Sequence, residues 1–363
     1  MLTALVFILV LSLLIFVHEF GHFLAAKLVG IKVEEFAFGL PFTKPIYQTK
    51  KKDLKISIYP IIFGGFVKLL GEEQKEIKGK PPKNAFCAKS PLARSFVVVS
   101  GVLMNFFLAV ITVAVILAHG IYVPTKNISI QQVVPNTPAA TANLQEGDII
   151  EKVADQKIER YQDLTNTIES YKGKTTTLQI KRKDQLIKVN VTPRTNYPKN
   201  EGPLGVVISN LSRQTYTWYQ IPIQAFAQTF SLCILITQTF FIMLKDIILT
   251  GSIPKDIAGP VGVAQLTGQA VQMGYLAVLQ LLALLSVNLV IFNILPFPAL
   301  DGGRLLFIVL EVIVGKKIAP KIENYTNMAG MFLLIFFVIL VTFNDLDRIF
   351  NFKKILDPII SRF

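Results

Sequence analysis

Two histidines and a glutamate near the N-terminus have the types and spacing for metal chemistry. His18 and His22 flank Glu19 in the pattern H-E-x-x-H, directly after the apolar run Leu2–Val17. In a helix, the i, i+4 spacing places both imidazoles on one face, where each reaches a zinc ion at ~2.0–2.1 Å. Glu19 then lies beside the metal without being a ligand, where it can take a proton from zinc-bound water. The pattern predicts one zinc ion per chain and a hydrolytic reaction.

The same five-residue pattern also arises by chance, and a helical histidine is often only a packed residue. Here, however, three ionisable groups adjoin an apolar stretch of membrane length, where such groups are costly and mark function by default. We therefore interpret His18, Glu19 and His22 as a metal site.

A catalytic zinc ion usually has three protein ligands and one open position, so a third ligand must come from elsewhere. His119, the other histidine, follows the apolar run Ser95–Ala118, and a helix of that length places it ~30 Å from the side of the membrane where the run begins. We exclude it and interpret it as an interfacial residue. Asp301 is our candidate because it follows an apolar helix and a turn with two prolines. It is also suited to cap the helix at residues 302–314, a role compatible with ligation.

The composition favours the bilayer as solvent, with 52% hydrophobic and 17% charged residues. Several apolar stretches approach or exceed the ~20 residues that a membrane-crossing helix needs. They are Leu2–Val17, Ser95–Ala118, Ile223–Leu244, Tyr275–Leu295 and Met328–Phe343. The first lacks the basic flank and the cleavage site of a signal peptide, so we expect a permanent span. We predict a helical membrane protein with about four transmembrane helices.

The charge pattern predicts the orientation. The net charge of +13 is concentrated in loops beside apolar runs without a recognition motif, so we expect no nucleic-acid partner. Lys27–Arg94 contains fourteen lysines and arginines, which predicts a cytoplasmic segment and an external N-terminus. Two cysteines, Cys87 and Cys233, lie in different settings and predict no disulfide framework.

The sequence predicts β-structure in two regions. Leu54–Ile58 alternates in polarity and is followed by Gly64-Gly65 and a second apolar run, which predicts a small hairpin or sheet beside the membrane. Residues 122–213 are polar, with short strand-like runs around a helix expected at Tyr161–Tyr171, which predicts a small α+β domain. We divide the chain into a membrane region at 1–121, this domain, interfacial amphipathic helices at 214–274 and a second membrane region at 275–363.

Ile223–Leu244 is long enough to cross a bilayer, yet it carries polar residues at roughly helical spacing. If Asp301 meets the zinc ion of His18, an odd number of crossings must separate the two residues. The run Ser95–Ala118 supplies one crossing. We therefore expect Ile223–Leu244 to lie along the outer membrane interface.

In its motifs the sequence resembles the bacterial site-2 proteases of the regulator-of-sigma-E-protease type, peptidase family M50. The resemblance rests on H-E-x-x-H, on Gly64–Lys68, on Ala258–Val261 and on N-x-x-P-x-P-x-L-D-G at Asn293–Gly302, and it covers nearly the whole chain. It implies His18, His22 and Asp301 as zinc ligands and Glu19 as general base.

The resemblance further implies a multi-pass protein of the bacterial inner membrane, whose active site faces the cytoplasmic side and whose substrates are transmembrane segments. Asn293 matches a position that holds substrate near the zinc ion, and Asn288 precedes it by slightly more than a helical turn. Pro296 and Pro298 between these asparagines and Asp301 are further substrate-binding candidates, as are Gly64 and Gly65, whose hairpin could pair with an extended substrate. A membrane asparagine otherwise serves a helix–helix hydrogen bond.

The domain at 122–213 is implied to be an extracytoplasmic PDZ domain. Gly202–Val206 could form its carboxylate-binding loop for a peptide C-terminus, or only a turn before a strand. Two other classes of function stay open at this point: a scaffold that captures partners without catalysis, and a metal transporter. A scaffold would not need Glu19, and a transporter would need further ligand sets along its path.

Overall fold

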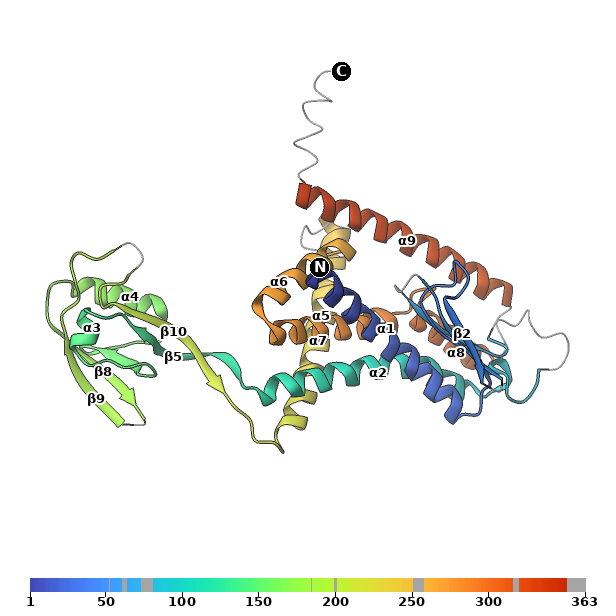
Figure 1. Ribbon diagram of the computed structural model, residues 1–363, viewed down its shortest axis with the longest axis horizontal. Helices are drawn as coiled ribbons and strands as arrows, with labels where there is room; N and C mark the ends of the chain where they lie inside the picture. Colours follow the sequence, from blue (N-terminus) through green and yellow to red (C-terminus); the bar gives the residue numbers. More distant parts are fainter. Residues whose placement is uncertain are drawn as a thin grey trace, which may run out of the picture. The chain divides into compact units, whose positions relative to one another are not determined.

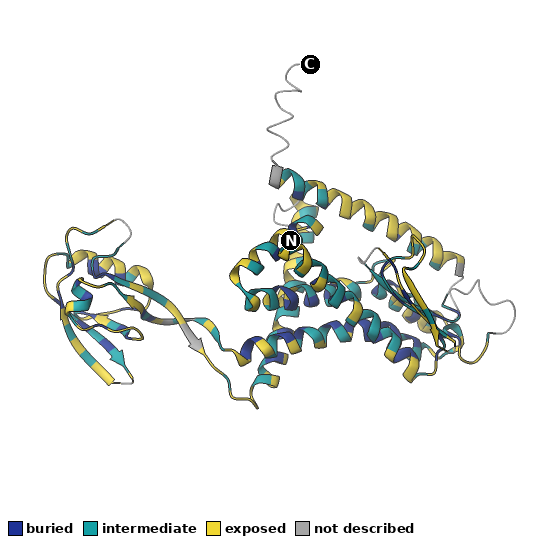
Figure 2. Ribbon diagram, viewed as in Figure 1, coloured by how far each residue is buried: buried dark blue, intermediate teal, exposed yellow. Residues whose placement is uncertain are grey.

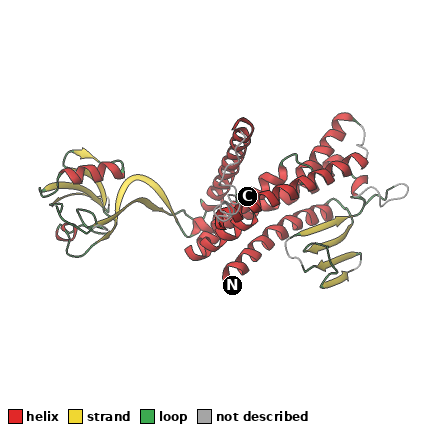
Figure 3. Cartoon of the chain, turned by 90° about the horizontal axis from the view of Figure 1, so that it is seen from above, coloured by secondary structure: helices red, strands yellow, loops and turns green. Residues whose placement is uncertain are grey.

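The computed structural model describes residues 1–51, 53–60, 64–72, 81–183, 185–198, 201–250, 258–315 and 320–350. The chain forms two compact units. Unit 1 combines Met1–Ile116 with Trp218–Phe363, and unit 2 is Leu117–Thr217. Figures 1 and 3 show that unit 1 consists of long helices with one sheet, whereas unit 2 is mostly β-structure.

Five helices in the described part of unit 1 are long and apolar enough to cross a membrane. They are α1 (Leu2–Leu28), α2 (Pro91–Ala118), α5 (Ile221–Thr250), α7 (Tyr275–Ile294) and α9 (Pro320–Phe350). Exposed side chains cover most of α5 and α9 (Figure 2), and many of them are large and apolar, as expected for surfaces in contact with lipid. The predicted fold class is confirmed, although this count gives five candidate spans where we expected about four; the fifth is α5.

The described part of unit 1 also contains two shorter α-helices. They are α6 (Pro260–Met273) and α8 (Asp301–Val314), which are each 14 residues long. At 1.5 Å per residue, such a helix measures about 21 Å and is too short to cross the hydrocarbon core.

The sheet of unit 1 has four strands in the order β2-β3-β1-β4. Its strands are β1 (Val33–Phe38), β2 (Tyr47–Lys51), β3 (Leu54–Ile58) and β4 (Gly65–Leu69). β1 lies in the centre and pairs in parallel with β3 and antiparallel with β4. A sheet is therefore present, but Leu54–Ile58 and Gly65–Leu69 do not form a hairpin with each other. Strand β1 was not predicted, because its sequence Val-Glu-Glu-Phe-Ala-Phe does not alternate in polarity.

The directions of three helices follow from their contacts. Thr3, at the start of α1, lies against Gly268 of α6, which directly precedes α7. Farther along α1, His18 lies 3.0 Å from Asp301, which directly follows α7 and its turn. α1 and α7 therefore run in the same direction. α2 runs the opposite way, because its residue Ser100 donates a hydrogen bond to the carbonyl of Gly21 while the later Asn105 lies beside His18.

The turn between α7 and α8 contains Pro296 and Pro298 and folds back tightly onto α8. A Cβ on Gly302 or Gly303 would collide with carbonyl oxygens of this turn. On the other side, a Cβ on Gly330 of α9 would lie 2.5 Å from Cβ of Pro298. The glycines of the L-D-G-G segment thus allow the turn to hold Asp301 at the first position of α8.

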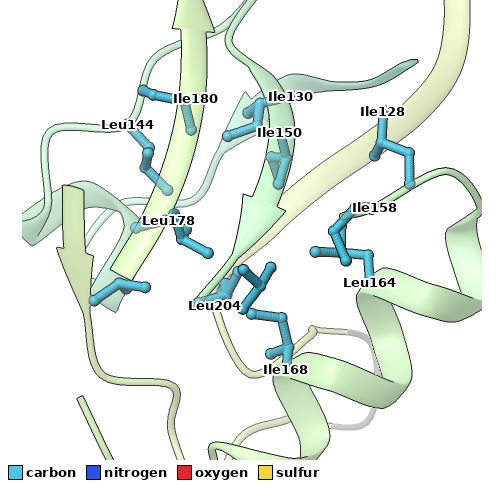
Figure 4. Packing of buried hydrophobic residues seen from close by; sticks show 13 residues of the cluster. Ile128, Ile130, Leu144, Ile150, Ile158, Leu164, Ile168, Leu178, Ile180 and Leu204 are labelled. Carbon is cyan, nitrogen blue, oxygen red and sulfur yellow. The ribbon is translucent and has the colours of Figure 1, made fainter. Parts of the chain in front are cut away.

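Unit 2 contains one sheet in the order β10-β5-β6-β8-β9, with β7 paired to β6. The strands are β5 (Ile121–Val133), β6 (Ile149–Val153), β7 (Gln156–Lys157), β8 (Thr176–Arg182), β9 (Gln185–Val191) and β10 (Val206–Gln214). Two helices, α3 (Pro138–Thr141) and α4 (Tyr161–Ser170), accompany the sheet. Figure 4 shows isoleucines and leucines of β5, β6 and β8 packed against Leu164 and Ile168 of α4. Unit 2 therefore has a hydrophobic core of its own.

Candidate metal centre

His18, His22 and Asp301 converge on one point in unit 1. The Nε2 atoms of the two histidines are 3.1 Å apart. The Oδ2 atom of Asp301 lies 3.0 Å from Nε2 of His18 and 3.3 Å from Nε2 of His22. Within the described residues, this is the one group of three potential ligands that is close enough to hold a metal ion.

These distances fit a zinc ion. In a tetrahedral site with bonds of ~2.0–2.1 Å, two ligand atoms are about 3.3 Å apart. Asp301 is the first residue of α8, and the N-cap position before it is Leu300, so Asp301 does not occupy the capping position that its sequence context also suited. Its Oδ2 atom is buried and accepts no hydrogen bond from the described residues. The carboxylate thus has a free lone pair next to two imidazole nitrogens, which is the chemistry of a zinc ligand set.

Hydrogen bonds from the far side orient the two imidazoles. Nδ1 of His22 donates to the carbonyl oxygen of Val97 at 2.8 Å, so Nε2 keeps the lone pair that a metal needs. Nδ1 of His18 lies 3.5 Å from the side-chain amide of Asn105, which is fully buried on α2. The Oδ1 atom of Asn105 has no partner in the described part of the chain. When Nε2 of His18 binds a metal, Nδ1 carries the proton, and an amide turned so that Oδ1 faces Nδ1 accepts a hydrogen bond from it.

Two glycines, Gly21 and Gly101, allow α1 and α2 to pack closely with the histidine pair between them. A Cβ on Gly101 would overlap the ring of His22 and lie 2.9 Å from Cε1 of His18. A Cβ on Gly21 would lie 2.5 Å from the carbonyl oxygen of Ser100. Both glycines are needed because any side chain there would push the two helices, and with them the ligand atoms, apart.

The three ligand candidates and Glu19 line a cavity of ≈560 Å³. Strand β4 forms one wall, and its side chains Phe66 to Leu69 line the cavity. β4 lies close to Glu19, since a Cβ on Gly65 would be 3.2 Å from Cγ of Glu19. Among the described strands, β4 stands at the edge of the sheet and pairs with β1 alone.

The other predicted site residues take different positions. Asn293 lines the cavity, whereas Asn288 does not; its amide donates to the carbonyl of Leu284 in the same helix at 3.0 Å. Pro296 and Pro298 shape the turn before Asp301 and are not among the residues that line the cavity. Gly64 and Gly65 lead into β4, where Gly64 accepts a hydrogen bond from the backbone N–H of Gly39.

Three polar side chains at the site were not among the predicted residues. Asn105 looks like an isolated polar residue within a span, and no local pattern connects it with His18. Glu72 and Arg304 form an ion pair that lines the cavity, and the charge of Glu72 raises the pKa of the Arg304 guanidinium. Arg304 lies one helical turn after Asp301, and that spacing on one face of α8 was the available signal.

A multi-pass helical membrane protein with H-E-x-x-H on one span and a facing aspartate after another defines a class of membrane metalloprotease. The model of peptidase family M50 matches residues 6–337, and the chain belongs to that family. It is thus a multi-pass zinc metalloprotease, so the scaffold and transporter alternatives do not describe it.

The relatives match this chain over nearly the full length of both proteins. A chain of Clostridium perfringens, named as a zinc metalloprotease, is 36% identical over 93% of this chain and 97% of its own length. The regulator of sigma-W protease RasP of Bacillus subtilis is 28% identical over 96% of this chain and 99% of its own length. Among solved structures, the PDZ domain of an SdrC-like protein of Listeria monocytogenes matches 25% of this chain and 95% of that chain, at 22% identity and a TM-score of 0.21.

Proposed function

We propose that this chain is an intramembrane endopeptidase that cuts transmembrane segments of other membrane proteins, with one zinc ion held by His18, His22 and Asp301. The observation that carries the proposal is the convergence of the three ligand atoms, within 3.0–3.3 Å of one another, in a cavity that Glu19 also lines. The name of the Bacillus subtilis relative supports regulatory substrates, such as anti-sigma factors; remnant signal peptides are a second substrate class of the same chemistry.

A zinc ion held by His18, His22 and Asp301 would supply Lewis acidity and would lower the pKa of a water molecule toward neutral. Glu19 would take the proton from the attacking water and pass it to the leaving amine as the peptide C–N bond breaks. His22 and His18 hold their ring orientation through Val97 and Asn105. Each of these steps needs only side chains that line the cavity or contact those that do.

A substrate helix must unwind at the peptide bond that is cut, because the backbone carbonyl groups of a helix are engaged in its own hydrogen bonds and are not accessible to attack. The freed backbone groups then need partners in a medium without water. Edge strand β4 lines the cavity, where its backbone could pair with an extended substrate, and the amide of Asn293 offers one more partner. We infer that Gly64 and Gly65 start this strand close to Glu19 so that a paired substrate passes over the metal.

We further propose that unit 2 is a PDZ domain on the extracytoplasmic side, with the catalytic cavity toward the cytoplasm of a bacterial inner membrane. A groove of ≈430 Å³ runs between α4 and the start of β10, and Gly202 to Leu204 line it. Gly205 has a φ of +72°, which fits a tight loop next to the groove. Such a groove accepts an extended peptide end.

The test of the proposed function is a cleavage assay of a transmembrane peptide with purified full-length chain in proteoliposomes. Glu19→Gln is expected to keep about one zinc ion per chain and to lose cleavage, because the ligands remain and the base is gone. Glu146→Gln, an exposed change in unit 2, is the matched control and should cut normally. Normal cleavage by Glu19→Gln would overturn the mechanism.

A further inference from the structure

A second cavity of ≈380 Å³ adjoins the catalytic cavity in unit 1. The two cavities share one wall, which is formed by Glu72, Phe86, Ala299 and Arg304. The ion pair between Arg304 and Glu72 lies on the shared wall. From there the second cavity extends to the beginnings of α2 and α9 and to the middle of α8.

The second cavity carries an excess negative charge. Arg94 and Glu311 pair through two hydrogen bonds of 2.9 Å, and Arg304 pairs with Glu72. Glu323, at the start of α9, also lines the cavity, and it makes no hydrogen bond or ion pair with any described residue. Two guanidinium groups therefore face three carboxylates.

Both arginines of the cavity are already held by carboxylates. The side chain of Arg94 is only 7% exposed and donates two hydrogen bonds to Glu311, and Arg304 pairs with Glu72. The carboxylate of Glu323 is therefore the group that the cavity offers to a cation.

Strand β4 leads from the catalytic centre to this cavity. The strand begins with Gly65 next to Glu19 and ends at Leu69, whose backbone N–H donates to Glu72 at 3.2 Å. A peptide extended along β4 covers this path in about five residues, or ~17 Å. Its continuation meets the Arg304–Glu72 pair and then the second cavity.

We propose that the second cavity is a subsite for a lysine or arginine of the substrate, located about five or more residues from the scissile bond, with Glu323 as its counter-charge. The inference rests on the proposed function, because it needs a substrate strand along β4. Transmembrane helices are flanked by lysine and arginine on the cytoplasmic side, so the subsite matches the chemistry of the segment that would reach it. This subsite would bind a basic residue at the end of the substrate's transmembrane segment while the catalytic centre cuts a bond within the segment.

The experiment compares kcat/KM of the full-length enzyme for three transmembrane peptides that differ only at positions five to seven from the cut, where they carry Lys, Ala or Glu. The native chain is expected to cut the Lys peptide about fivefold faster than the Ala peptide, mainly through a lower KM. Glu323→Gln should lose this Lys-to-Ala ratio. Glu323→Lys should invert the preference between the Lys and Glu peptides. Glu146→Gln should keep the native ratio.

Equal kcat/KM for the Lys and Ala peptides with the native chain would overturn the subsite. So would an unchanged Lys-to-Ala ratio in Glu323→Gln, or loss of all three cleavages in both Glu323 variants. These outcomes are separate from failure of the proposed function, which would appear as cleavage of the Ala peptide by Glu19→Gln. The charge preference is measured as a ratio within each enzyme, so a general loss of yield does not mimic it.

Discussion

Asn105→Ala is expected to weaken zinc binding although Asn105 does not contact the ion. Asn105 is fully buried, and its amide lies 3.5 Å from Nδ1 of His18. With Nε2 of His18 on the metal and the Asn105 amide turned so that Oδ1 faces Nδ1, Asn105→Ala leaves the Nδ1–H without an acceptor, which costs about 1–3 kcal/mol for a buried donor. That range corresponds to a loss of roughly 5- to 150-fold in affinity, and changes of this kind at other metal sites typically cost about 10–100-fold.

The assay is competition for zinc between the purified chain and a calibrated chelator, in the same detergent for every variant. Asn288→Ala is the matched control, because it also removes an asparagine from a span, but one whose amide donates to the carbonyl of Leu284. Asn105→Asp should retain most of the affinity, since its carboxylate still accepts from Nδ1 of His18. The reasoning fails if Asn105→Ala and Asn288→Ala bind zinc equally tightly.

Three further outcomes are expected. Asp301→Ala should lose both zinc and cleavage, whereas Asn293→Ala should lose cleavage with its zinc content nearly intact; full zinc in Asp301→Ala by metal analysis would remove Asp301 from the ligand set. A reporter fused after Leu249 should lie on the same side of the membrane as unit 2, and a reporter on the opposite side would show that α5 crosses. Asp148→Asn should destabilise unit 2 by about 3 kcal/mol, because Asp148 is buried and makes two hydrogen bonds of 2.7 Å to Arg182; unchanged hydrogen exchange in unit 2 would contradict this.

The expectation for α5 follows from the helix directions. α2 ends on the side of the membrane where α1 begins, and α7 starts on that same side, next to α6 and Thr3. An even number of crossings must therefore lie between α2 and α7. In the described part of that interval, α5 is the one helix long enough to cross, since α6 has 14 residues. One crossing by α5 alone would place Asp301 on the wrong side, so we expect α5 to lie along the interface.

The sequence predicted the helices and the ligand candidates because their signals are local. The spacing of His18 and His22 places both on one helical face whatever the surroundings. The apolar runs predict the long helices of unit 1, although helix ends such as Leu28 of α1 extend well beyond the apolar core. The central strand β1 was missed because it is partly buried on both faces and carries Glu34 and Glu35, so neither period two nor an apolar run marks it.

The partners that orient the metal site and shape its neighbouring cavity could not be predicted in the same way. Arg94 and Glu311 are 217 residues apart in the sequence, and Glu72 and Arg304 are 232 residues apart. Each pair joins elements that meet only after α2, α8 and the sheet have packed, so no window of the sequence contains the signal. The candidate metal ligands and Glu19, by contrast, come from helix α1 and from the turn before α8, where local sequence patterns mark them. The proposed selectivity at Glu323 depends instead on where separate elements meet, and a change in packing could alter it while leaving H-E-x-x-H intact.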